Sequence, residues 1–437
     1  MDDSSPRPEP SGSNDLAGNI VGLEGSRESR SFIGLHVTSN CRRADGALVR
    51  IFDRGAAMRL ANVKPASIEI SQATGSRYQR LRACRFESPG EAAKLASELA
   101  EVEAELVSQL METQQGATGG PLAVGVSDPG LWHLRSNDRS QFTGLCDASR
   151  LAAATGQNVI DGFASGDLAS GGQGGPISAM PLWVLFRSPT TPRLLIDLGR
   201  TARLTYLPPS HSASALSEIL SFDVGPGTNL LDYLALRFSD GKIEFDPGGR
   251  LAVQGRSIDK LIEHWLADSY FDQPLPRWNP VGVQPYEELE ESVRMAAETG
   301  WSVRDLLCTA THFIVRSILR DIERRIPDSP QVTEVVLTGG GSLNGLLLSE
   351  LTARLPGVTW LTTRDLKIPD GSLDATVGAI LAAFHVDRTP GNLPSVTGAE
   401  TSRVLGRLTP GSPANWNRLL DVMRSAGQAD HQLRPAV

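Results

Sequence analysis

The sequence predicts an α/β protein built from two similar halves around a central cleft. Its 437 residues exceed what one hydrophobic core usually holds, because domains of about 100 to 200 residues are typical. Short β-like runs are followed by a long helical pattern and a buried strand, and the same kinds of pattern return after about residue 140. Two α/β units are the simplest architecture that accounts for both observations.

The first half begins at Phe32 with a predicted β-meander. The runs FIGLHV, GALVRIF and SIEI are separated by turn residues, and a further β-like run covers 78–86. The segment 88–91 (SPGE) has Ser, Pro and Glu in the positions of a capping box. We therefore expect it to open an amphipathic helix that ends near Thr113. A buried strand is expected at 121–126.

The second half repeats strands and helices, and Gly156 marks the end of its first helix. A helix expected at 148–154 stops at this glycine, because Gly is the usual residue just beyond a helix C-terminus. Strands are expected at 158–160, 194–199, 203–208, 222–223 and 334–341. Helices are expected at 228–238, 257–268, 284–298, 302–325, 344–355 and 375–384, and the last of these is expected to return to the first half.

These patterns divide the chain into four segments. Residues 1–30 are rich in Ser, Pro and charge, which predicts a disordered tail. The first domain is expected at 31–138 together with about 375–400, and the second at 139–374. Residues 401–437 are expected to form a C-terminal tail.

The composition favours small molecules as binding partners. A net charge of −8 without a basic block argues against nucleic-acid binding. No run approaches the ~20 apolar residues of a membrane helix, and the N-terminus is not signal-like, so we expect a cytoplasmic protein that does not contact membranes. Cysteines without a CxxC pair or metal-ligand spacing predict reduced thiols. They are Cys41, Cys84, Cys146 and Cys308.

The segment 167–176 (DLASGGQGGP) is the strongest candidate for a functional loop. Glycine is needed where φ is positive or where backbone approaches a ligand, and four glycines within five positions leave N–H groups to face a bound group. Apolar runs on both sides favour a functional loop over a flexible linker. Asp167 is a candidate general base, and the alternative is that it caps a helix.

Four motifs occur together in the order of one known family. They are 167–176, 222–232 (FDVGPGTNLLD), 339–344 (GGGSLN) and 391–399 (GNLPSVTGA). Over about residues 32–400 the chain resembles the anhydro-N-acetylmuramic acid kinases, bacterial peptidoglycan-recycling enzymes of the sugar kinase, actin and hexokinase superfamily. The resemblance implies a two-domain actin-like ATPase fold, which is ribonuclease H-like, with an interdomain cleft.

The resemblance also implies an ATP- and Mg²⁺-dependent reaction on a 1,6-anhydro amino sugar. A carboxylate activates water to open the anhydro ring while the freed 6-oxygen takes the γ-phosphoryl group, and Asp167 matches that base. The sugar-binding residues implied are Gly171, Gly172, Gln173, Gly174, Asp223, Gly225, Pro226 and Gly227. The nucleotide-binding residues implied are Gly199, Thr205, Gly339, Gly340, Gly341 and Asn344. No metal ligand is assigned, and a homodimer is a hypothesis.

The two phosphate loops of the family differ in this chain. The first aligns with 34–45, where Arg42 replaces an acidic residue, and the second with 197–205, where Arg200 replaces a glycine. Because phosphoryl transfer depends on positioning and on bound Mg²⁺, these changes predict weak Mg-ATP binding. Arg42 and Arg43 either bind phosphate directly or form a solvated pair.

Two further stretches also depart from the family. In 125–133 the first histidine and the glutamine are replaced, and His133 is the histidine that remains, while 277–282 differs at most positions. The glycines 339–341 have the alternative of being only a tight strand-to-helix turn. Two hypotheses follow. The protein is an anhydro-sugar kinase with a remodelled nucleotide site, or a catalytically degenerate homologue that binds a sugar or nucleotide or acts as an interaction protein.

Overall fold

The computed structural model describes most of the chain. Its described residues are 29–83, 88–113, 119–133, 141–212, 214–239, 241–279, 299–327 and 332–432. The helix expected at 284–298 lies outside these ranges, as does the expected tail apart from residues 29 and 30.

The first half is built on a sheet with the strand order β13-β7-β4-β1-β2-β3, so the strand expected at 158–160 in the second half belongs to the first sheet, as β7. The first three strands along the chain form an antiparallel meander, and β4 and β7 extend it as parallel strands beside β1. The strand bounds are β1 Arg30–Val37, β2 Arg43–Phe52, β3 Arg59–Glu69, β4 Val124–Ser127, β7 Val159–Asp161 and β13 Arg407–Thr409. A separate ribbon pairs β5 (Leu131–His133) with β6 (Gln141–Thr143).

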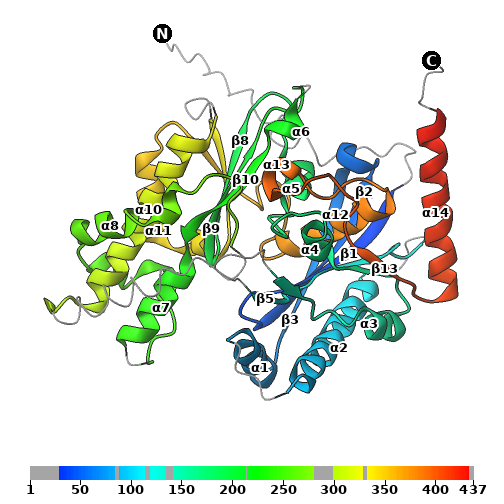
Figure 1. The fold of residues 1–437 in the computed structure, drawn as a ribbon, viewed down its shortest axis with the longest axis horizontal. Coiled ribbons are helices and arrows are strands. Elements are labelled where there is room, and N and C mark those ends of the chain that lie inside the picture. Colours follow the sequence, from blue (N-terminus) through cyan, green and yellow to red (C-terminus); the bar gives the residue numbers. More distant parts are fainter. Residues whose placement is uncertain are drawn as a thin grey trace, which may run out of the picture.

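The second half repeats this topology with the order β10-β9-β8-β11-β12. An antiparallel meander is again extended by two parallel strands, so β8 corresponds to β1 and β11 to β4. The bounds are β8 Arg193–Leu198, β9 Thr201–Leu207, β10 Leu220–Pro226, β11 Glu334–Thr338 and β12 Thr359–Thr362. The duplicated order confirms the predicted α/β class with its actin-like arrangement of two related units (Figure 1).

Helices cover the two sheets on separate sides of the molecule (Figure 1). The first half carries α1 Gln72–Arg82, α2 Gly90–Glu112, α3 Ala148–Thr155, α4 Phe163–Leu168, α5 Ala179–Phe186, α12 Leu373–Val386, α13 Pro394–Thr397 and α14 Pro413–Gln432. The second half carries α6 Ala215–Glu218, α7 Thr228–Phe238, α8 Asp259–Leu266, α10 Val303–Arg325 and α11 Gly345–Arg354. In the part of the chain described, no helix is long and apolar enough to cross a membrane.

The strand β1 shows why both faces of the first sheet are covered. Alternate side chains of a strand point to opposite faces, so Ile33 and Leu35 join the core beneath α2, whereas Phe32 joins the core around α12. Gly34 lets α12 approach closely, because a Cβ there would lie 1.7 Å from the carbonyl oxygen of Ala375. The apolar helix near the C-terminus therefore packs directly on the first sheet.

The sequence misplaced some elements of the first half. The strand expected at 78–86 is wrong where described, because residues 72–82 form α1, whose first turn is capped by the Ser71 hydroxyl accepting from Thr74 N. The capping box expected at 88–91 does not form either. The Glu91 carboxylate accepts instead from Arg77 Nε at 2.9 Å, and Pro89 occupies the N-cap position of α2.

The C-terminal segment is more ordered than the tail expected at 401–437. The strand β13 pairs with β7, and α14 lies along the outer side of the first half (Figure 1). Leu419 is fully buried, and Trp416 and Val422 pack on the same core. Their spacing places them on one face of α14, and burying that face offsets the entropy of ordering the segment.

Candidate active site

Asp167 lies inside α4 with its side chain fully buried. Its Oδ1 accepts hydrogen bonds from Asn392 Nδ2 at 2.8 Å and from Thr397 Oγ1 at 2.7 Å, and its Oδ2 accepts from Gly174 N at 2.8 Å. The N-cap of α4 is Gly162, with φ 70°, so the alternative that Asp167 caps a helix is not met. The carboxylate instead ties the glycine loop to a segment more than two hundred residues later.

The glycine loop wraps around this carboxylate. Gly171 and Gly174 have φ of 82° and 84°, values that side chains rarely adopt. A Cβ at Gly172 would lie 2.2 Å from Asp167 Oδ2, so glycine is required there for a steric reason. Gln173 donates from its backbone N to Thr397 O at 2.9 Å and from Nε2 to Pro276 O at 3.2 Å. Its Oε1 is buried and accepts no hydrogen bond within the described residues.

An aromatic wall, formed by Trp132, Phe142 and Trp278, flanks the same loop. The Trp132 ring centroid lies 4.6 Å from that of Phe142 and 4.8 Å from that of Trp278. A Cβ at Gly174 would touch Trp132 at 2.7 Å. Trp132 and Trp278 are both only partly buried, and they come from opposite halves of the chain. Rings with one covered and one accessible face are common in sites that bind small molecules.

Asp223 is fully buried, and both of its carboxylate oxygens already have protein partners. Oδ1 accepts from Arg203 Nε at 2.8 Å, and Oδ2 accepts from Asn279 N at 2.9 Å. Its carbonyl oxygen also accepts from Arg277 Nε at 2.7 Å. In this structure Asp223 therefore holds the segment that carries Trp278.

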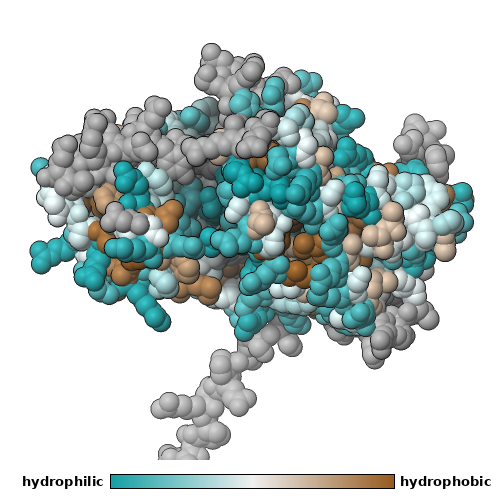
Figure 2. Space-filling model, turned by 90° about the horizontal axis from the view of Figure 1, so that it is seen from below, coloured by the Kyte–Doolittle hydropathy of each residue, from teal (hydrophilic) through white to brown (hydrophobic). Residues whose placement is uncertain are grey.

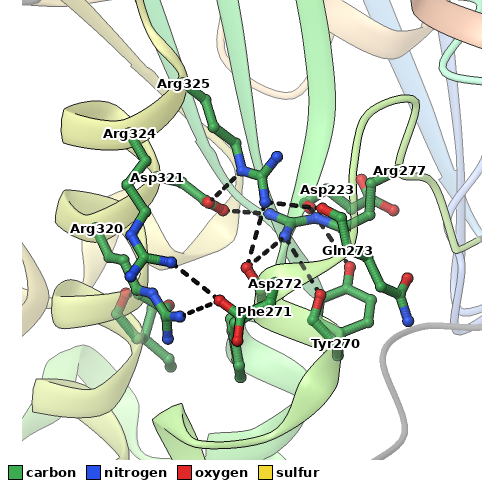
Figure 3. Close-up of polar contacts among 12 residues, drawn as sticks. Asp223, Tyr270, Phe271, Asp272, Gln273, Arg277, Arg320, Asp321, Arg324 and Arg325 are labelled. Atoms are coloured by element: carbon green, nitrogen blue, oxygen red, sulfur yellow. Dashed lines mark hydrogen bonds and ion pairs between the residues drawn. The ribbon is translucent and has the colours of Figure 1, made fainter.

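That segment is fixed to the second half by a buried ion pair. The Arg277 guanidinium pairs with Asp321 on α10, and Arg325 Nε donates to the other oxygen of Asp321 at 2.8 Å. Arg277 also lies over the ring of Tyr270, 5.0 Å from its centroid (Figure 3). A buried guanidinium with this many partners holds one orientation, so the 275–279 segment has a defined position.

The remaining glycines of the implied sugar and nucleotide sites meet at one turn of the second half. A Cβ at Gly227 would lie 2.2 Å from Gly199 O, and one at Gly339 would lie 2.6 Å from Gly199 N. A Cβ at Gly341 would lie 2.7 Å from the carbonyl oxygen of Leu198, whereas Gly340 has open space around it. Gly227, implied at the sugar, thus packs against Gly199, which is implied at the nucleotide. Gly225 faces Phe271, and the neighbouring Pro226 pairs with Thr201.

Two residues of the implied nucleotide set have structural partners. Asn344 caps α11, because its Oδ1 accepts from Leu346 N at 3.1 Å and Leu347 N at 3.2 Å. Thr205 lies inside the sheet, where its hydroxyl is 2.8 Å from that of Ser221. The structure does not bring Thr205 to the turn at Gly199.

Asp197, at the end of β8, is the carboxylate closest to this turn. A Cβ at Gly339 would lie 2.5 Å from its Oδ1. Burial raises the pKa of Asp197 to about 6. The guanidinium of Arg203 opposes this rise, and the carboxylates of Asp374 and Asp223 add to it. Repulsion among these carboxylates is the electrostatic setting that a bound cation relieves. Within the described ranges no group of three or more His, Cys, Asp and Glu could hold a metal by itself.

The comparisons with known proteins decide the family. Residues 32–411 match the family described as Anhydro-N-acetylmuramic acid kinase. The chain belongs to this family. Three relatives bear the same name. The one from Acaryochloris marina is 36% identical over 59% of this chain and 68% of its own length. Those from Nitrosomonas europaea and Synechococcus sp. strain WH7803 are 32% and 29% identical, over 73% and 86% of this chain and 84% and 99% of their own lengths.

Solved structures also match, at low identity. The xylulose kinase from Rhodospirillum rubrum is 12% identical, covers 92% of this chain and 99% of its own, and has a TM-score of 0.39. The family match across most of the chain supports anhydro-N-acetylmuramic acid kinase function and does not favour the degenerate-homologue hypothesis.

The first hairpin aligns with a phosphate loop of the family. In this chain two of its backbone N–H groups donate to side chains of the same hairpin. Thr38 Oγ1 accepts from Arg43 N at 3.1 Å, and Asn40 Oδ1 accepts from Arg42 N at 3.2 Å. Arg42 pairs with Glu244 across the two halves, and both side chains are mostly exposed. Arg43 Nε donates to Asp45 Oδ1 at 2.8 Å. Neither arginine is a free anion clamp in this structure.

Several site residues were not found from the sequence. Asn392 and Thr397 lie in the motif at 391–399, but no local sequence pattern indicated that they bind Asp167. Trp132 and Trp278 had no spacing signal because they meet across the two halves. Asp197 had one usable signal, an acidic residue at the end of a buried strand directly before the Gly199 turn. His133, the retained family histidine, is exposed at the end of β5.

Proposed function

We propose that this protein opens 1,6-anhydro-N-acetylmuramic acid and phosphorylates it at the 6-oxygen, with ATP as the phosphoryl donor, in peptidoglycan recycling. The single observation that supports it most is the setting of Asp167, a buried carboxylate enclosed by a glycine loop and held by three donors. Such preorganisation is what a general base needs. The family match supplies the substrate class.

In the proposed step, Asp167 takes a proton from water as the water oxygen attacks C1 of the sugar. The bond between C1 and the 6-oxygen breaks, and the 6-oxygen attacks the γ-phosphorus of ATP while ADP leaves. Because Asp167 is fully buried here, water and sugar reach it only after the glycine loop or the facing segment 391–399 moves. Local opening of this kind is common at sites that exclude bulk water.

Gln173 and the aromatic wall support sugar binding beside Asp167. Gln173 Oε1 is buried and has no donor among the described residues, so it can accept a hydrogen bond from a sugar hydroxyl. Trp132 and Trp278 offer apolar ring surface against Gly174 and Gly175, the two residues that follow Gln173. A pocket with an apolar wall and a few placed polar groups is the usual form of a small-molecule site.

The nucleotide is proposed to bind at the turn formed by Gly199, Gly227 and Gly339. Gly340 leaves open space on this side, which suits close approach of phosphates. The residues fit Mg²⁺, because it prefers oxygen ligands and is usually held by one or two carboxylates together with substrate phosphates. Asp197 and Asp374 would hold the ion, which would neutralise charge on the transferring phosphoryl group.

The test is ADP release from ATP with the purified anhydro sugar. We expect turnover that depends on both substrates and on Mg²⁺, and Asp167→Asn is expected to lower kcat by about 10²- to 10⁴-fold with little change in sugar affinity. Asp387→Asn is the matched control, since that carboxylate is also almost fully buried but binds Arg30 instead. Undiminished turnover in Asp167→Asn would contradict the base role, and no turnover in the intact chain would contradict the activity.

A cytoplasmic location and a homodimer are also retained as proposals. The first is supported by the substrate class of the family, since a kinase needs the ATP pool of the cell. The homodimer is checked by sedimentation of the full chain, with and without ligands.

A further inference from the structure

The segment 391–399 provides two of the three hydrogen bonds to Asp167. Thr397 is fully buried and Asn392 is 2% exposed. Building on the proposed function, we infer that Thr397 and Asn392 are positioning residues that occupy Oδ1 of Asp167, so that Oδ2 is the oxygen that takes the proton from water.

The two carboxylate oxygens have different surroundings. Oδ1 accepts from two side chains, at 2.7 and 2.8 Å, and these bonds use both of its lone pairs. Within the described residues Oδ2 accepts from Gly174 N alone, so one lone pair is left. Gly172 packs directly against Oδ2, because any side chain there would begin 2.2 Å from this atom. Oδ2 is therefore the oxygen that keeps a lone pair for a reactant, which reaches it when the glycine loop moves.

The polarity of these contacts is also determined. Asn392 Oδ1 accepts from Arg403 N at 2.7 Å, so its amide NH₂ group is the end that faces Asp167. The Thr397 hydroxyl has one hydrogen, and its contact with Asp167 at 2.7 Å is much shorter than its contact with Leu393 O at 3.3 Å. Both groups thus donate to Asp167. Donors at one oxygen hold the carboxylate plane without blocking the other oxygen.

The segment has a second link to the loop that closes over Oδ2. Thr397 O accepts from Gln173 N at 2.9 Å, and Ser170 O accepts from Glu400 N at 2.8 Å. A shift of Thr397 would therefore move both the carboxylate and the glycines around it. This predicts that loss of the Thr397 hydroxyl alters proton transfer more than sugar binding.

The test compares Thr397→Val, which removes the hydroxyl at nearly constant volume, with Thr397→Ser, which keeps it. We expect Thr397→Val to lower kcat about 10- to 100-fold with the sugar KM within about twofold of the parent. The acid limb of its pH–rate profile is expected to move to higher pH by about one unit, because a hydrogen bond to a carboxylate favours the charged form. Thr397→Ser should restore kcat and the profile.

Thr311→Val is the control for losing a buried hydroxyl, since Thr311 is also fully buried but bonds to Leu307 O on α10. A Thr397→Val enzyme with the parent pH–rate profile would overturn the positioning role while leaving the proposed activity intact. An inactive parent chain would contradict the proposed activity instead. In that case carbon-13 NMR of the Asp167 carboxyl carbon still tests the hydrogen bond from Thr397, and Asp167→Asn assigns the signal. A titration midpoint that is the same in Thr397→Val as in the parent would overturn the positioning role.

Discussion

Glu103 is a carboxylic acid in the apolar core of the first half. It lies on α2 with 3% of its surface exposed, and its Oε2 has no hydrogen-bond partner within the described residues. Burial raises the pKa of Glu103 to about 8, and the carboxylates of Asp128 and Asp161 add to the rise. At neutral pH this side chain is therefore mostly protonated in the folded protein, whereas the unfolded chain ionises it.

This raised pKa predicts that stability falls with increasing pH. Between the ordinary glutamate pKa of 4.5 and about 8 the folded state binds more protons than the unfolded state, so the stability that the protonated Glu103 allows is fully present below pH 4.5 and is lost as the pH rises toward 8. By pH 7 the buried Glu103 lowers the free energy of unfolding by up to about 3 kcal/mol. Glu103→Gln should remove this effect, raising the free energy of unfolding more at pH 8 than at pH 5 in urea titrations. Glu105→Gln, exposed on the same helix, is the control, and equal effects at both pH values would contradict the assignment.

The turn between β11 and α11 combines two roles at the element scale. Asn344 serves the helix, because its side chain caps the first amides of α11. At Gly340, four residues earlier, an added Cβ would meet no atom within 4 Å beyond its chain neighbours, and φ is not positive. One residue therefore stabilises the element, and the other leaves room for a ligand.

Substitutions at these two positions should have opposite effects. Asn344→Ala is expected to lower the free energy of unfolding by about 1 kcal/mol, because it removes an N-cap, and Asn344→Asp should retain most of the stability. Gly340→Ala should leave Tm unchanged and raise the KM for ATP, because its methyl group would enter the proposed phosphate space. Thermal melts and ADP-release kinetics check both. An unchanged ATP KM in Gly340→Ala would place the nucleotide elsewhere.

At the scale of the whole molecule, the site depends on contacts between the two halves. Trp132 meets Trp278, Gln173 binds Pro276 O, and Arg42 pairs with Glu244. The face shown in Figure 2 is mostly hydrophilic, with apolar side chains in separate patches. A ligand that touches both the glycine loop and the Gly199 turn would bridge two units that already share a buried core, in which Phe32 of the first sheet belongs to the same cluster as Leu195 and Val336 of the second.

We expect the two halves to close on ligand, because a ligand shifts such an equilibrium by binding the closed state more tightly. Small-angle scattering should show a smaller radius of gyration when the anhydro sugar and a nonhydrolysable ATP analogue are both bound. Each ligand alone serves as the comparison. An unchanged radius of gyration at saturation, established by calorimetry, would contradict a hinge.

Many elements could be predicted from local patterns. The helix expected at 228–238 has the bounds that the structure shows. The helix expected at 302–325 forms as α10, and in the structure Ser302 and Asp305 close a capping box at its start. The prediction was wrong at 78–86, because it relied on β-like composition. It did not consider that Ser71 could cap a helix that begins several residues earlier. The C-terminal segment was missed because its order comes from packing on the first core.

The sequence by itself determined the family motifs, the candidate base Asp167 and the need for glycine around it, because these follow from residue type and local spacing. Tertiary structure alone decided what holds that base, since Asn392 and Thr397 lie 225 and 230 residues away along the chain. It also placed Gly227 against Gly199 and gave Asn344 a capping role. Hydrogen bonds between distant segments depend on how the two sheets pack, and no local pattern encodes that packing.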